Sequence, residues 1–178
     1  MTINNMNKSR KAIVNKYPKV IVTDVDGCLT DDCFYYLENG DTARKFNVKD
    51  GYGVKLLNHI GIEIWALSGE KSEAVFRRLR KLGFNEIFLG IDFKLKFLEK
   101  VLETKNLEWD DIYYLGNDLN DMLVGLKCGK FWCPNDAHEL IKSNAIVLSK
   151  KGGEGVLREM VEFVLGEEVE SIYRALYG

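Results

Sequence analysis

The stretch VIVTDVDGCLTDD, from Val20 to Asp32, decides how the rest of the sequence is interpreted. Its first residues are apolar and largely β-branched, which predicts a buried strand over Val20–Val25. The strand delivers two carboxylates, Asp24 and Asp26, to one place. Because residues i and i+2 of an extended segment point the same way, both side chains can serve one site. Taken alone, the Asp-x-Asp-Gly pattern also fits a turn or a calcium loop.

Strand-like and helix-like segments alternate along the rest of the chain. Further strands are expected at Ile62–Leu67, Glu86–Gly90, Asp111–Gly116, Lys130–Cys133 and Ala145–Leu148. Helices are expected at Gly51–His59, Lys71–Lys81, Lys94–Lys105, Leu119–Lys127, Glu154–Leu165 and Glu167–Leu176, with stops at Gly61 and Gly83. Two β-prone runs around Asn39-Gly40 predict a hairpin. The alternation predicts an α/β fold, a central parallel sheet flanked by helices.

Composition excludes several classes of protein. The chain has 178 residues, of which 46% are hydrophobic and 29% charged, and its net charge is −2. This balance fits one globular domain, expected over residues 19–178, and gives no basic field for nucleic acid or a membrane surface. Residues 1–18 are polar and basic, so we expect a lead-in rather than a secretion signal. The four cysteines form no C-x-x-C pair, and we expect reduced thiols in a cytoplasmic protein.

The residues that follow the predicted strands carry chemical groups. In open parallel sheets, ligands bind beyond the carboxyl ends of the strands. The residues placed there are Asp24 and Asp26, then Ser68, Gly69 and Glu70, then Lys94, and finally Asn117, Asp118 and Asp121 of GNDLND. Clustered oxygen ligands without His or Cys suit Mg²⁺, and a lysine with a hydroxyl suits phosphate. One aspartate can attack phosphorus while the other transfers the proton.

Each of these features has a plainer interpretation when taken alone. Ser68-Gly69 is more often a helix cap, Lys94 a solvated side chain, and GNDLND a capped turn. A nucleotide-binding Rossmann protein lacks support, because no G-x-G-x-x-G follows the first strand. The placement of all four groups at successive strand ends favours the functional interpretation.

Together, DVDGCLT, SGE, Lys94 and GNDLND resemble the haloacid dehalogenase superfamily of phosphohydrolases. The resemblance implies a Rossmann-like fold in which Asp24 is the nucleophile and Asp26 the general acid and base. It also implies that Ser68 holds the phosphate and Lys94 neutralises it.

The implied metal ligands for Mg²⁺ are Asp24, Asp26 through its main-chain carbonyl, Asn117 and Asp118. The family usually has aspartate where this chain has Asn117. An amide oxygen can coordinate but brings no charge, so this position puts the metal affinity in question.

The segment from Asp32 to Gly51 has room only for the hairpin, so a β-hairpin stands in place of a cap domain. In this the chain resembles the small phosphatases of 2-keto-3-deoxy sugar acids and the domain fused to some sialic-acid cytidylyltransferases. RKFNVKDGYGVKLL and LSKKGGEGVLREMVEFVL, with Arg158, strengthen that resemblance. It implies a homotetramer with a central barrel of hairpins.

Glu70, Arg78 and Lys81 resemble the pattern of phosphatases that act on a nonulosonate 9-phosphate, such as that of KDN (deaminated sialic acid). The octulosonate 8-phosphate enzymes usually read T-G-R where this chain reads Ser68-Gly69-Glu70. On a helix at about 100° per residue, Arg78 and Lys81 can lie near Glu70. The plainer interpretation is a solvated basic face.

The remaining candidate substrate-binding residues are Thr30, Gly69, Asp121 and Arg158. We expect a small sugar acid phosphate as substrate, most of all KDN 9-phosphate or a related nonulosonate. The alternatives are 3-deoxy-D-manno-octulosonate 8-phosphate as substrate, another phosphatase of a sugar-nucleotide pathway, or a non-catalytic oligomerisation module.

Overall fold

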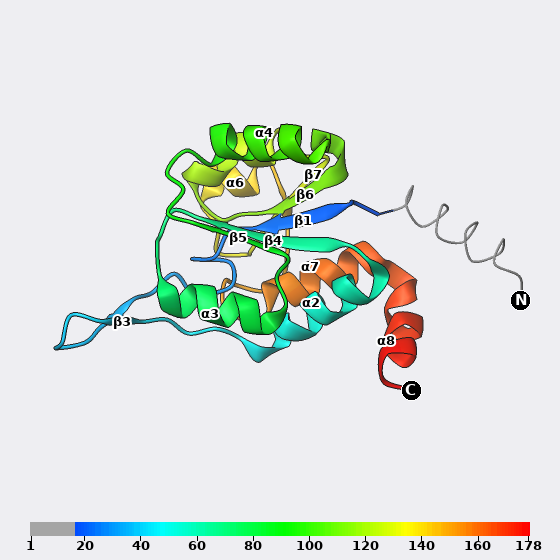
Figure 1. Ribbon diagram of the computed structural model, residues 1–178, viewed down its shortest axis with the longest axis horizontal. Coiled ribbons are helices and arrows are strands. Elements are labelled where there is room, and N and C mark those ends of the chain that lie inside the picture. The colour runs from blue at the N-terminus through cyan, green and yellow to red at the C-terminus, as the bar shows by residue number, and fades with distance from the viewer. Residues whose placement is uncertain (1–16) are drawn as a thin grey trace, which may run out of the picture.

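The computed structural model describes residues 17–178, so the predicted lead-in lies, up to residue 16, outside the described residues. A six-stranded sheet runs in the order β5-β4-β1-β6-β7-β8, and every neighbouring pair is parallel (Figure 1). The strands are β1 (Val20–Thr23), β4 (Glu63–Ser68), β5 (Glu86–Leu89), β6 (Ile112–Leu115), β7 (Lys130–Cys133) and β8 (Ile146–Val147). The predicted α/β fold with a central parallel sheet is confirmed.

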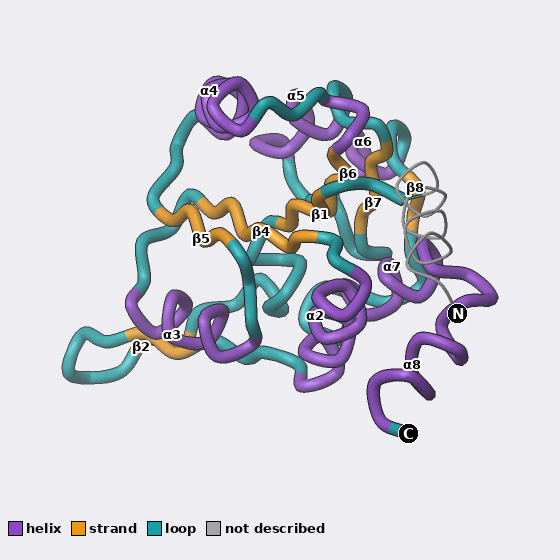
Figure 2. The backbone as a smooth tube through the Cα atoms, turned by 45° about the vertical axis from the view of Figure 1, so that its right-hand side comes forward, coloured by secondary structure: helices purple, strands orange, loops and turns teal. Residues whose placement is uncertain are grey.

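Helices cover both faces of this sheet (Figures 1 and 2). One face carries α2 (Val48–Ile60), α3 (Glu73–Leu82) and α7 (Val156–Leu165), and α8 (Val169–Tyr177) packs beside α2. The other face carries α4 (Lys94–Lys105), α5 (Met122–Gly125) and α6 (Glu139–Lys142). Short 3₁₀ turns lie at Trp109–Asp111, Leu119–Asp121 and Gly166–Glu168.

Strand β1 explains why the opening stretch is apolar at successive positions. Ile21 packs into the core on the α2 and α7 side, with Leu57 and Leu157. Val20 and Val22 point to the opposite core. Because side chains alternate across a strand and both faces are covered by helices, each position of β1 is buried.

The predicted hairpin projects from the body of the molecule (Figure 1). It pairs β2 (Tyr35–Tyr36) with β3 (Thr42–Ala43) in antiparallel fashion. The N–H of Gly40 donates to the carbonyl of Leu37 over 2.9 Å and closes the turn. The hairpin occupies the segment in which it was expected to stand in place of a cap domain.

The boundaries of several helices differ from the predicted ones because capping residues set them. The side chain of Asn47 caps α2, which therefore begins at Val48 rather than Gly51. Ser72 caps α3, so Glu70 precedes the helix, and the angular argument that joined Glu70 to Arg78 and Lys81 is wrong. Gly61 and Gly83 end these helices as predicted.

Other differences are smaller. The predicted helix Leu119–Lys127 divides into a 3₁₀ turn and the short α5, and α6 was not predicted. Among the helices of residues 17–178, none has the length and apolar character needed to cross a bilayer.

Candidate active site

A cleft of about 350 Å³ opens at the carboxyl ends of β1, β4 and β6. Of the predicted residues, it is lined by Asp24, Asp26, Ser68, Gly69, Glu70, Asn117 and Asp118. These residues come from three separate strand ends, as the parallel sheet requires. Asp32, Phe34, Asp92 and Asn120 also line the cleft and were not predicted.

Asp24 is fixed at the base of the cleft by the sheet itself. Its N–H continues the ladder to the carbonyl of Leu115 over 2.8 Å, so the backbone leaves the strand only after this residue. Oδ1 accepts from the N–H of Val25 over 2.7 Å, and Oδ2 lies 2.9 Å from Nζ of Lys94. Both oxygens of the carboxylate therefore have a partner, and the residue still lines the cleft.

Asp121 is buried behind Asp24 and Lys94 and accepts hydrogen bonds on both of its oxygens. Its Oδ1 accepts from Nζ of Lys94 over 2.7 Å and from the hydroxyl of Tyr114 over 2.6 Å. Its Oδ2 accepts from the N–H groups of Asn117 and Asp118, over 2.9 and 3.3 Å. Asp121 is fully buried and does not line the cleft, so the predicted substrate contact is corrected to support of Lys94 and of the GNDLND turn.

The electrostatics of this buried group favour a cation above it. Burial, and then the charge of Asp121, raise the pKa of Asp24 to about 8, although Lys94 opposes the shift. Burial disfavours the charged form of Lys94, but the carboxylates of Asp121 and Asp24 outweigh it and raise the pKa of the amine. An ionised Asp24 at neutral pH therefore calls for further positive charge in the cleft.

The oxygen donors at the cleft, carboxylates together with an amide, fit Mg²⁺. Asp24, Asp118 and the amide of Asn117 supply oxygen, and no imidazole lines the cleft. Over residues 17–178, no group of three or more His, Cys, Asp and Glu side chains is arranged to hold a metal ion. A cation would therefore rely on Asn117, on main-chain oxygen or on water, and Oδ1 of Asn117 now lies 3.8 Å from the thiol of Cys28.

Asp26 is held by two donors on one oxygen. Oδ1 accepts from the hydroxyl of Thr30 over 3.2 Å and from Nε of Arg44 over 3.0 Å. Arg44 was missed because it follows the hairpin and not a strand of the main sheet. An antiparallel bridge between Thr30 and Phe46 returns the chain to the loop at residues 25–31, which we call the catalytic loop because it carries the candidate residue Asp26, and brings Arg44 with it.

The turn after β4 forms the opposite wall. Ser68 is buried, and its Oγ accepts from the N–H of Glu70 over 3.2 Å. The side chain of Glu70 is 63% exposed and lies 3.8 Å from the guanidinium of Arg44. Glu70 thus reaches the mouth of the cleft.

Besides Asp121, four predicted substrate-binding residues do not line this cleft: Thr30, Arg78, Lys81 and Arg158. Thr30 is fully buried, and its hydroxyl donates to Asp26 over 3.2 Å. Arg78 lines a separate hollow of about 300 Å³ beside the base of the hairpin. Lys81 is exposed on α3, and Nε of Arg158 pairs with Glu162 over 2.6 Å on α7. The set Glu70, Arg78 and Lys81 is therefore not assembled around one cleft of this chain.

The glycine-rich segment supports the catalytic loop. The N–H of Gly153 donates to the carbonyl of Cys28 over 2.9 Å. A Cβ at Gly152 would lie 2.2 Å from the carbonyl oxygen of Gly27 and 2.9 Å from that of Thr30. Only glycine permits this approach, so the glycine-rich segment packs directly against the loop that follows Asp26.

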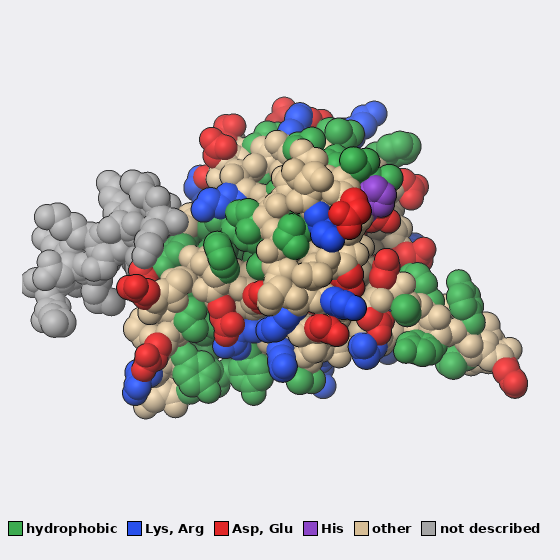
Figure 3. Space-filling view, turned by 180° about the vertical axis from the view of Figure 1, so that it is seen from behind, with side chains coloured by type: hydrophobic (Ala, Val, Ile, Leu, Met, Phe, Trp, Pro, Cys, Tyr) green, Lys and Arg blue, Asp and Glu red, His purple; other side chains and the backbone are tan. Residues whose placement is uncertain are grey.

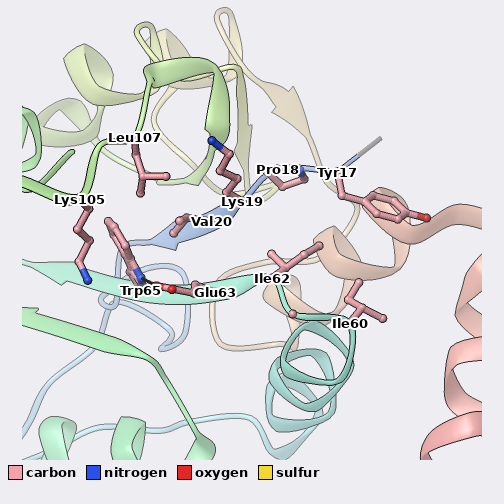
Figure 4. Close-up of a pocket in the computed structure, with 11 residues that line it drawn as sticks. Tyr17, Pro18, Lys19, Val20, Ile60, Ile62, Glu63, Trp65, Lys105 and Leu107 are labelled. Carbon is pink, nitrogen blue, oxygen red and sulfur yellow. Dashed lines mark hydrogen bonds between the residues drawn. The ribbon is translucent and has the colours of Figure 1, made fainter. Parts of the chain in front are cut away.

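A larger hollow of about 410 Å³ lies at the opposite ends of β1 and β4 (Figure 4). Its charged residues are paired: Lys19 with Asp111, Lys105 with Glu86, and Glu63 with the indole of Trp65. It therefore offers no free group for chemistry, and the smaller cleft is the candidate active site.

A comparison with models of known protein families finds no match. The 3-deoxy-D-manno-octulosonate 8-phosphate phosphatase KdsC of Haemophilus influenzae is 35% identical over 155 residues, 86% of this chain and 86% of that protein. A probable YrbI family phosphatase from Pseudomonas syringae superposes with a TM-score of 0.87 at 32% identity, over 96% of this chain and 98% of the other.

The 3-deoxy-D-manno-octulosonate 8-phosphate phosphatase of Moraxella catarrhalis, solved with magnesium, phosphate and KDO, gives a TM-score of 0.86 at 28% identity. It covers 96% of this chain and 98% of its own. Its magnesium agrees with the predicted cofactor, and the alternative of a non-catalytic module gains no support from phosphatase relatives. The chain thus belongs to the KdsC/YrbI family of haloacid dehalogenase phosphatases and is a phosphoric monoester hydrolase.

Proposed function

We propose that this protein is a Mg²⁺-dependent phosphatase of a 2-keto-3-deoxy sugar acid phosphate. The observation that carries the proposal is Asp24, fixed at the end of β1 beside Lys94 and open to an oxygen-lined cleft. When bound, Mg²⁺ supplies positive charge that keeps Asp24 ionised and offsets the charge of the phosphate. Asp24, Asn117, Asp118 and the main chain at Asp26 are the groups that would hold it.

Asp24 attacks phosphorus, the bond to the sugar oxygen breaks, and an aspartyl-phosphate forms. Asp26 donates a proton to the departing oxygen and then takes one from the water that hydrolyses the aspartyl-phosphate. Lys94 and Ser68 bind the oxygens of the phosphate.

The first candidate substrate is 3-deoxy-D-manno-octulosonate 8-phosphate, which the names of the relatives support. The second is a nonulosonate 9-phosphate such as that of KDN. One observation favours the second: Glu70, not the arginine of the T-G-R pattern, stands at the mouth of the cleft. A carboxylate there suits substrate hydroxyls better than a second anionic group.

Phosphate release with saturating Mg²⁺ on both sugar acid phosphates and on N-acetylneuraminate 9-phosphate separates the candidates. A kcat/KM ratio of about tenfold corresponds to about 1.4 kcal/mol of transition-state discrimination and identifies the preferred chain length. Failure to hydrolyse any of them would contradict the substrate class.

Replacing Asp24 tests the mechanism. Asp24→Asn should lower turnover by about a thousandfold or more, because an amide cannot form the aspartyl-phosphate. The unfolding midpoint should change little, since Lys94 keeps Asp121 as a partner. Asp110→Asn makes the same substitution at an exposed position away from the cleft, and as the control it should leave turnover unchanged. Retained turnover in the Asp24 variant would refute the assignment of the nucleophile.

We further propose a cytoplasmic homotetramer. The supporting feature is the hairpin, whose exposed side chains include Phe34, Tyr35, Tyr36 and Leu37. An apolar arm of this kind is typical of a surface that another subunit covers.

A further inference from the structure

We propose that Arg44 is a positioning residue that turns Asp26 so that one defined oxygen carries the proton to the leaving group. The inference rests on the proposed function, because it concerns how the general acid of that reaction is aimed. Arg44 comes from the segment that follows the hairpin strand β3.

The contacts on Asp26 divide its two oxygens into different roles. Nε of Arg44 and Oγ1 of Thr30 both donate to Oδ1, over 3.0 and 3.2 Å. A carboxyl oxygen that already accepts two hydrogen bonds is a poor place for a proton. Oδ2 has neither donor, so it is the oxygen that can be protonated and can donate. The side chain is 17% exposed and lines the cleft, so Oδ2 is within reach of a ligand.

Arg44 is itself fixed in place, which is what a positioning residue requires. Its side chain is only 5% exposed, and its guanidinium carbon lies 4.2 Å from the centre of the Phe34 ring. Nη1 donates to the hydroxyl of Thr42 over 3.4 Å, and Nη2 lies 3.8 Å from Oε2 of Glu70. Phe34 just before β2, Thr42 of β3 and Glu70 of the turn after β4 therefore set the direction of the guanidinium together.

This arrangement affects one step of the reaction most. As the ester bond breaks, the proton moves from Oδ2 of Asp26 to the departing oxygen, and Asp26 becomes a carboxylate beside the guanidinium of Arg44. An alkoxide leaving group needs that proton. A nitrophenolate leaves without it, because it is a weak base. Loss of Arg44 should therefore slow alkyl esters more than activated aryl esters.

The test compares kcat/KM for two esters. One is 4-nitrophenyl phosphate, and the other is whichever of the candidate sugar acid phosphates the wild-type enzyme hydrolyses fastest. Arg44→Gln should lower the value for the sugar ester about tenfold to a hundredfold more than the value for the aryl ester. Arg44→Lys, which keeps one charged donor, should recover part of the loss. Arg77→Gln, on an arginine whose side chain is 78% exposed, is the control and should change neither value.

If the wild-type enzyme is active, two results would overturn the inference: an equal loss on both esters, which indicates general damage to the fold, or no loss on either. Thermal unfolding of each variant identifies the first case. Wild-type turnover, measured first, tests the proposed function by itself. A wild-type enzyme inactive on both esters would overturn that function and this inference with it.

Discussion

Asn117 is the residue at which the chemistry of the site departs most from the expected pattern. Asn117 lines the cleft, but its amide oxygen offers a cation a dipole without charge and lies 3.8 Å from the thiol of Cys28. Since affinity for a hard cation rises with the number of charged oxygen ligands, this position should limit binding of Mg²⁺.

Asn117→Asp should lower the Mg²⁺ concentration for half-maximal phosphate release by several-fold to about tenfold. Calorimetric titration with Mg²⁺ should show the same change without substrate. Asn120→Asp is the matched control, because it adds the same charge to the same cleft at a position not predicted to ligate. If both variants tighten Mg²⁺ binding equally, the gain comes from the added negative charge in the cleft, and Asn117 is not a ligand.

The sequence identified the residues of the site that directly follow strands of the main sheet. Asp24, Ser68 and Asn117 could be predicted because apolar runs end at them and parallel strands end together. Arg44 could not, since its position depends on how the hairpin returns to the catalytic loop. Arg78 was predicted to join Glu70 from helical spacing, but a cap at Ser72 begins the helix after Glu70.

At the scale of elements, one buried carboxylate joins two helices that are distant in sequence. Asp50 lies in the first turn of α2, and its Oδ1 accepts from the N–H of Arg158 in the first turn of α7 over 3.1 Å. Its Oδ2 is buried and, among the described residues, has no hydrogen-bond partner. Burial raises the pKa of Asp50 to about 6, against the opposing hydrogen bond from Arg158. Helix periodicity could predict both helices but not this contact between them.

Asp50 should make stability depend on pH. Its pKa rises on folding, so the folded state is favoured while Asp50 is protonated and loses stability as pH rises from about 4 to about 6. The loss, for a shift of about two pKa units, is on the order of 3 kcal/mol. Asp50→Asn keeps the acceptor for Arg158 but cannot ionise. Its free energy of unfolding in urea should lack this fall.

Urea unfolding of the wild-type protein and the variant at several pH values between 4 and 7 measures the difference. Asp110→Asn removes an exposed carboxylate and shows how far the free energy of unfolding changes with pH when Asp50 is intact. Parallel curves for the wild-type protein and Asp50→Asn would mean that Asp50 is solvated enough to titrate normally in the folded state.

At the scale of the whole molecule, the apolar arm formed by the hairpin is the feature that a single chain does not explain. Figure 3 shows green side chains gathered on this projecting arm. Tyr36 is 80% exposed and Leu37 is 51% exposed, although burying a leucine is worth about 1.5–3 kcal/mol. Sequence alone predicted the hairpin from Asn39-Gly40, but the exposure of its side chains follows from the fold, in which the hairpin projects from the body of the molecule.

If hairpins of several copies pack together, polar residues at their tips should separate the copies. Tyr36→Ser combined with Leu37→Ser should lower the mass measured by light scattering after size-exclusion chromatography, from that of a tetramer toward that of a single chain. Leu126→Ser is the control, because this leucine is 56% exposed on another part of the surface. An unchanged mass in the hairpin variant would exclude the hairpin as the assembly surface. Dissociation by the control alone would place the contact near α5 instead.

Because Arg44 joins the base of the hairpin to Asp26, dissociation of the subunits should also slow hydrolysis of the sugar ester more than hydrolysis of the aryl ester.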